Sequence, residues 1–92
     1  MRIEKIEIFS RENCDACEVW KPRITEICRT HNVRCEVTDI DKKTSAKEYL
    51  RILGLQCLPV TAITLENGEN ELLEGCFSKE FFVNKIEKLA LL

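Results

Sequence analysis

Hydrophobic and polar residues alternate in several short segments of the chain. A period of two is typical of a strand that buries one face, and β-branched residues favour that conformation. Asn67-Gly68, the strongest hairpin signal in the sequence, separates two of these segments. On this pattern we predict four strands, at residues 3–10, 33–40, 60–65 and 71–74.

A helical spacing of apolar residues follows the first predicted strand, from Cys14 to about Thr30. Pro22 lies inside this segment and should kink the helix, because proline donates no amide proton and crowds the preceding turn. The face predicted to point inward holds Ala16, Trp20, Ile24, Ile27 and Cys28.

Two further helices are predicted from their end signals. Ser45-x-x-Glu48 has the form of a capping box, and Gly54 would end that helix in the left-handed conformation. Ser78 caps the last helix. The inward faces of these two helices hold Ala46, Tyr49, Leu50 and Leu53, and Phe82, Ile86, Leu89 and Ala90.

The predicted element order is β-α-β-α-β-β-α. The first three strands are joined through helices, so we expect their pairings to be parallel, and the last two form an antiparallel hairpin. The sequence therefore predicts an α/β fold, a four-stranded mixed sheet flanked by three helices, in a single domain over residues 1–92.

Composition narrows the possible functions. Hydrophobic residues make up 45% of the 92 residues and charged residues 33%, which excludes a disordered chain and a membrane protein. The net charge of −2 and the scattered lysines give no basic patch, so neither nucleic acid nor a membrane is an expected partner. Acidic residues near the N-terminus argue against a secretory signal, and we expect a cytoplasmic monomer.

Cys14-Asp15-Ala16-Cys17 follows a predicted strand and opens a helix. The first amides of a helix lack intrahelical partners and carry partial positive charge, which favours the thiolate of a cysteine placed there. Cys17 lies one turn further on and can attack a mixed disulfide formed on Cys14. We therefore predict that Cys14 is a nucleophile and Cys17 the resolving thiol.

A CxxC pair can also be half of a zinc site, which would need a second pair at similar spacing. The other cysteines are too far apart to form one, so no metal is expected. We interpret Cys28 and Cys35 as core residues. Cys57 and Cys76 form a second thiol pair, modify a binding groove through oxidation or metal capture, or are small, partly buried residues, and we favour the last interpretation.

The chain resembles the thioredoxin/glutaredoxin family, and in particular a small glutaredoxin-like thioredoxin, over nearly all its length. Pro22 lies five residues after the second cysteine, as the helix proline of thioredoxins does. The other matching segments are Cys14-Asp15-Ala16-Cys17, Thr38-Asp39-Ile40-Asp41, Leu55 to Thr61, Glu66-Asn67-Gly68-Glu69 and Gly75-Cys76-Phe77-Ser78-Lys79.

This resemblance implies the thioredoxin fold, with a cis bond between Leu58 and Pro59. The backbone of Leu58 and the open space at Gly75 would then bind an extended substrate segment beside Cys14. It also implies a thiol–disulfide oxidoreductase that reduces protein disulfides and carries electrons. A thioredoxin reductase or a low-molecular-weight thiol would regenerate it, with no cofactor beyond the reversible Cys14–Cys17 disulfide.

Several positions depart from the family pattern. Asn13 replaces the tryptophan before the first cysteine, and Ile8 and Val37 replace a buried Asp–Lys pair, so no buried carboxylate would accept the Cys17 proton. Arg11 lies where glutaredoxins place a basic residue that meets glutathione, and it can equally be a solvated loop charge. Lys79-Glu80 does not match the glutathione-binding acid, which leaves glutathione binding open.

Asp15 and Glu18 add negative charge near Cys14, and like charge disfavours the thiolate. A less stabilised thiolate accompanies a more stable disulfide, so we expect a reducing potential. The alternative function is a binding module of the same fold that holds a metal or a client protein through its cysteines without turnover.

Overall fold

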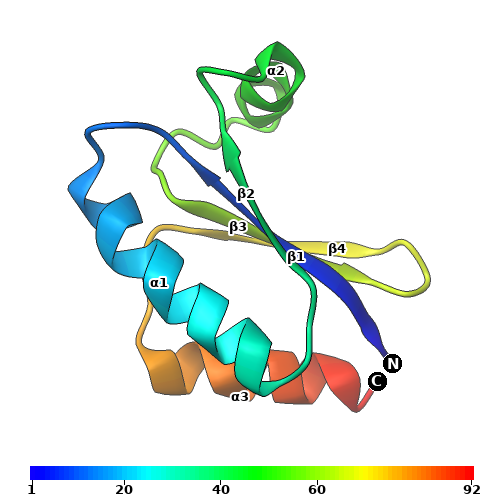
Figure 1. Cartoon of the computed structure of the whole chain (residues 1–92). Helices are drawn as coiled ribbons and strands as arrows, with labels where there is room; N and C mark the ends of the chain where they lie inside the picture. Colours follow the sequence, from blue (N-terminus) through cyan, green and yellow to red (C-terminus); the bar gives the residue numbers. More distant parts are fainter.

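The computed structural model describes residues 1–92 and has the predicted element order (Figure 1). The first and third predicted strands have the predicted bounds, and the second is shorter at both ends. The elements are β1 (Ile3–Ser10), α1 (Asp15–Thr30), β2 (Cys35–Asp39), α2 (Thr44–Ile52), β3 (Val60–Leu65), β4 (Asn70–Glu74) and α3 (Lys79–Ala90).

The four strands form one mixed sheet in the order β2-β1-β3-β4. β1 pairs with β2 in parallel, but β3 is antiparallel to both β1 and β4. The expectation that β3 is parallel is therefore wrong. The reason is the nine-residue α2, which lies at the end of the sheet where β2 finishes and does not run back along it (Figure 1). β3 therefore enters at that same end and runs in the opposite direction.

Helices α1 and α3 cover one face of the sheet, and α2 packs on the other face (Figure 1). Neighbouring residues of β1 serve both faces, since Ile8 belongs to the cluster under α1 and α3 and Phe9 to the cluster under α2. Ile3 and Ile6 pack on the same face although they are three residues apart. An irregularity in the β1–β3 register between Ile3 and Lys5 restores the alternation, as a β-bulge does.

Trp20 is the largest side chain buried without solvent contact, and it lies where α1 meets the sheet. Its ring meets Phe82 of α3 edge to face, with the ring centroids 5.6 Å apart. Its Nε1 donates a 2.8 Å hydrogen bond to Oγ1 of Thr61 in β3, which is also fully buried. This bond fixes the depth at which the first half of α1 lies on the sheet.

The helix ends confirm part of the predictions. Ser78 caps α3 by accepting a hydrogen bond from the Phe81 amide, and Gly54 follows α2 with a φ of +73°, where a residue without Cβ is favoured. The capping box at Ser45 is wrong, because α2 begins at Thr44 and its N-cap is Lys43, two residues earlier, with no side-chain cap. Glu48 binds Arg51 instead.

Several residues predicted to lie inward are exposed. Tyr49 and Leu53 are 39% and 44% exposed, so the buried face of α2 holds only Ala46 and Leu50.

Other exposed positions lie on α1, α3 and β2. Ala16 is exposed at the start of α1, and Cys17 occupies the buried position there. Ala90 is exposed because it lies in the last turn of α3. Val37 is 51% exposed because it lies on β2, the strand at the sheet edge. Pro22 lies within α1, which continues to Thr30, and the predicted kink stays a prediction. No helix combines the length and the apolar character needed to span a membrane.

Replacing Thr61 with Val should destabilise the protein by about 1–3 kcal/mol, because the buried Trp20 Nε1 then loses its acceptor. Thr64→Val is the matched control on the same strand: Thr64 is partly exposed and bonds only to Asn70, so we expect a change within about 0.5 kcal/mol. Urea unfolding followed by Trp20 fluorescence measures both. Equal losses in the two variants would contradict the role given to this bond.

Candidate active site

Cys14 is the N-cap of α1, with extended backbone angles of φ −116° and ψ 102°. The turn into the helix is made by Asn13, whose φ is +57°, in the left-handed region that asparagine tolerates better than most residues. As N-cap, Cys14 places its Sγ over the first amides of the helix, and the Cys17 amide donates to it at 3.2 Å. The site is therefore built to stabilise negative charge on this sulfur.

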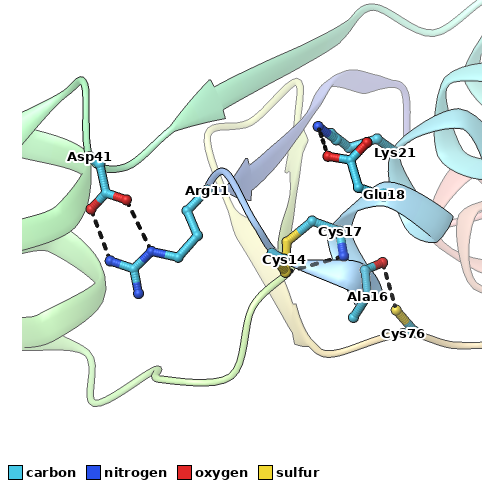
Figure 2. The surroundings of a disulfide bond; sticks show 8 residues. All are labelled: Arg11, Cys14, Ala16, Cys17, Glu18, Lys21, Asp41 and Cys76. Atoms are coloured by element: carbon cyan, nitrogen blue, oxygen red, sulfur yellow. Dashed lines mark hydrogen bonds and ion pairs between the residues drawn. A yellow bond between two sulfur atoms is a disulfide. The ribbon is translucent and has the colours of Figure 1, made fainter.

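Cys14 and Cys17 are joined by a disulfide, with their Cα atoms 5.2 Å apart (Figure 2). The two cysteines differ in burial: Cys14 is partly exposed, whereas Cys17 has no solvent-accessible surface. A partner molecule therefore reaches Cys14 first, whereas Cys17 is accessible only to the Cys14 sulfur beside it. This asymmetry fits the roles predicted for the two thiols.

The surroundings of Cys17 contain no buried carboxylate. Ser10 and Thr61 are the polar residues in the buried set, and Ile8 is fully buried at the position where the family pattern has an acid. Glu18 is exposed and pairs with Lys21 at 3.0 Å (Figure 2). A proton leaving Cys17 therefore has to go to water or to a departing thiolate.

Two loops border the disulfide, and hydrogen bonds hold them in place. The Leu58–Pro59 bond is cis, as the resemblance implies, and Pro59 is buried. The Gly75 amide donates to the Pro59 carbonyl at 2.8 Å, and the thiol of Cys76 donates to the Ala16 carbonyl at 3.4 Å (Figure 2). Predicted residues from three separate segments are thus brought together.

The backbone conformation at position 75 requires glycine. Its φ of +92° is strained for any residue with a Cβ. A Cβ placed there would have no atom within 4 Å, so the space beside Gly75 is open. An extended chain can approach the backbone at this point.

Glu74 was missed by the sequence analysis. Its Oε2 accepts hydrogen bonds from the amides of Gln56 and Cys57, both at 2.9 Å. The Cys57 and Gln56 amides lower the pKa of this carboxyl. Glu74 thus fixes the backbone directly before Leu58. Its place at the end of a predicted strand, next to Gly75, is the only sequence signal, and it does not reveal a partner eighteen residues away.

Arg11 is neither free nor turned toward the disulfide. Its guanidinium donates two hydrogen bonds to Asp41, at 2.9 and 3.1 Å, and points away from Cys14 (Figure 2). These bonds raise the pKa of Arg11 and lower that of Asp41. Arg11 and Leu58 both line a cavity of about 240 Å³. Its lining also includes Lys47, Arg51 and Gln56. Two predicted substrate residues therefore share one cationic cavity.

The remaining cysteines are free and differ in exposure. Cys57 and Cys76 are exposed, so the interpretation of both as partly buried residues is wrong, and their position on the two bordering loops explains it. Cys28 is buried in the core, as expected, whereas Cys35 is only half-buried because β2 is an edge strand. No group of three or more His, Cys, Asp or Glu side chains is arranged to hold a metal ion.

Known proteins share this fold. No protein-family model and no curated protein sequence matches the chain. Among solved structures, thioredoxin 1 from Thermosipho africanus TCF52B is 26% identical with a TM-score of 0.77, over 94% of this chain and 93% of that one. The glutaredoxin-like protein NrdH-redoxin from Escherichia coli, described as having a thioredoxin-like activity profile, is 25% identical with a TM-score of 0.62, over 88% and 92% of the two chains. Chloroplastic thioredoxin z, 13% identical with a TM-score of 0.76 over 100% and 97%, shares the fold.

These likenesses confirm the thioredoxin fold and the resemblance to thioredoxin- and glutaredoxin-like proteins. Together with a disulfide between cysteines at CxxC spacing, they support a thiol–disulfide oxidoreductase in the general sense.

Glu74→Gln should make the free energy of unfolding less dependent on pH between pH 7 and pH 3. The pKa of Glu74 is lowered in the folded state, so its ionised carboxylate stabilises the fold above the pKa of the unfolded state, and this contribution is lost as the pH falls through the folded pKa. The variant should therefore be less stable than the unaltered chain at pH 7, with the gap closing at pH 3. Urea unfolding at both values measures this.

Glu69→Gln, in the exposed β3–β4 turn, is the control and should leave the stability difference between pH 7 and pH 3 unchanged. A gap between Glu74→Gln and the unaltered chain that stays constant over this pH range would show that the two amide bonds do not depend on the carboxylate charge.

Proposed function

We propose that the chain is a dithiol reductant of protein disulfides, with Cys14 as the nucleophile and Cys17 as the resolving thiol. The observation that carries this proposal is the pairing of a partly exposed sulfur at the N-cap of α1 with a fully buried one a turn later. A site that only held a client or a metal would have no need for this difference in exposure.

In the proposed reaction, the Cys14 thiolate attacks one sulfur of a substrate disulfide, and the other substrate sulfur leaves as a thiolate. The mixed disulfide places the Cys14 sulfur next to Cys17, which loses its proton and attacks Cys14. The substrate departs as a dithiol, and the Cys14–Cys17 disulfide remains. The Cys17 amide, which hydrogen-bonds the Cys14 sulfur, stabilises this sulfur as a thiolate before it attacks the substrate disulfide.

The substrate segment is proposed to lie between the two bordering loops, against the backbone of Leu58 and over Gly75. Main-chain hydrogen bonds to an extended peptide need a fixed backbone and open space. Glu74 supports the first requirement, and the empty surroundings of Gly75 support the second. Protein disulfides of varied sequence would fit such a groove.

Regeneration is proposed to come from a thioredoxin reductase or a low-molecular-weight thiol. The cavity that Arg11, Lys47 and Arg51 line supports a small thiol that carries carboxylates, as glutathione does. Asp41 competes for Arg11, which argues for modest affinity. The proposal includes a monomer that works as an electron carrier in the cytoplasm, where reductants keep thiols reduced, and no cofactor beyond the reversible disulfide.

Cys14→Ser should lower insulin-disulfide reduction with dithiothreitol to the rate of dithiothreitol alone, because the attacking sulfur is gone. Cys17→Ser should accumulate a mixed disulfide with substrate, because the resolving thiol is gone. Turbidity follows the first result, and non-reducing electrophoresis of trapped complexes follows the second.

Cys76→Ser is the matched control, since Cys76 touches the same turn at Ala16 but has no step in the reaction. It should retain most of the activity. Equal rates in the unaltered chain and in Cys14→Ser would instead favour the binding module, which holds its client without turnover.

The midpoint potential should lie nearer to the value of about −270 mV known for thioredoxin than to the −180 mV or so of protein disulfide isomerase. Asp15 adds uncompensated negative charge beside Cys14, whereas the charge of Glu18 is paired with Lys21. Asp15→Asn should therefore raise the potential by up to about 20 mV, the equivalent of about 1 kcal/mol for an exposed charge.

Equilibration with glutathione buffers measures this potential. Glu87→Gln on α3, which lines a cavity with Arg2 and Ala90 near the chain ends, is the control and should change nothing. A strongly oxidising couple in the unaltered chain would refute the assignment as a reductant.

A further inference from the structure

Cys28 and Cys35 form a second pair of thiols, outside the site described above. Cys28 lies in the last turns of α1, and its carbonyl accepts the Val33 amide at 2.8 Å, so the chain turns back at once toward the start of β2. Cys35 pairs in register with Ile6 of β1 and packs against the same core cluster to which Ile6 and Cys28 belong. The two sulfurs are thus held on one face of the sheet.

The surroundings make the two thiols unequal. The neighbouring Cys35 thiol, together with burial, raises the pKa of Cys28, which keeps its proton. The Cys28 thiol in turn lowers the pKa of Cys35, with a smaller contribution from Thr25. Burial opposes this effect, and Glu36 opposes it more weakly. Cys35 is also the more exposed of the two.

We propose that Cys28 and Cys35 form a second dithiol–disulfide couple, which reacts with low-molecular-weight disulfides through Cys35. This couple is independent of the first one. Fourteen residues of helix separate Cys14 from Cys28, which is roughly 20 Å at 1.5 Å per residue, so the two pairs do not exchange electrons within one molecule.

The reaction balances without further reagents. The Cys35 thiolate attacks a disulfide RSSR, forms a mixed disulfide and releases one RS⁻. The Cys28 thiol then loses its proton and attacks the Cys35 sulfur, which releases the second RS⁻. Two protein thiols and RSSR give one protein disulfide and two RSH, so the protein is oxidised and the small disulfide is reduced.

The test uses the full chain, reduced and then incubated with glutathione disulfide. Free thiols are alkylated, and the chain is cut with trypsin. Arg29 and Arg34 lie between the two cysteines, so cleavage there releases peptides 24–29 and 35–42, which stay together only through a disulfide. We expect this linked peptide. We also expect it in Cys14→Ser, where the proposed function is lost.

Two variants test the order of steps. Cys28→Ala should retain a glutathione adduct on Cys35, because nothing resolves it, and Cys35→Ser should leave the buried Cys28 unmodified. Cys57→Ser/Cys76→Ser is the matched control, since it removes two exposed thiols and should form the same linked peptide. Alkylation of both Cys28 and Cys35 in the oxidised chain, or an adduct on Cys28 in Cys35→Ser, would overturn the proposal.

Discussion

The proposed chemistry depends on the interaction between the first backbone amides of α1 and the Cys14 sulfur, and on the contacts that hold these amides in place. Cys14 is the N-cap, so the amide of Cys17 points at its Sγ as a structural consequence of starting the helix there. The same backbone places the Cys17 sulfur in the interior, one turn later. One local conformation thus gives both a stabilised, reachable sulfur and a protected partner, without any charged side chain in the buried set.

That conformation needs support from the sheet, since an isolated helix start is not rigid. Trp20, one turn after Cys17, supplies it by its hydrogen bond to Thr61 of β3. β3 continues from Pro59, whose carbonyl binds Gly75, and Cys76 returns to the carbonyl of Ala16. These hydrogen bonds therefore link α1, β3 and the Gly75 loop to one another around the disulfide. β3 and the Gly75 loop both contact the first turns of α1 through side-chain hydrogen bonds.

The sequence was sufficient where local patterns and local structure agree. The bounds of β1 and β3, the cap at Ser78 and the left-handed Gly54 all follow from short-range rules. The direction of β3 did not, because it depends on where α2 packs and not on any residue of β3. The capping box at Ser45 failed because Glu48 has a competing partner in Arg51, three residues later on the same exposed face.

The same distinction applies to the site. The CxxC motif, the proline at position 59 and Gly75 carry signals that can be read one segment at a time. The partners of Glu74 and Arg11 cannot be read in this way, because these contacts arise only when segments eighteen and thirty residues apart meet. The Cys28–Cys35 pair belongs to this second kind. Both residues read as ordinary core positions, and only the tight turn after α1 makes them neighbours with unequal burial. Side chains whose chemistry depends on a partner are therefore the ones that a pattern within one element does not reveal.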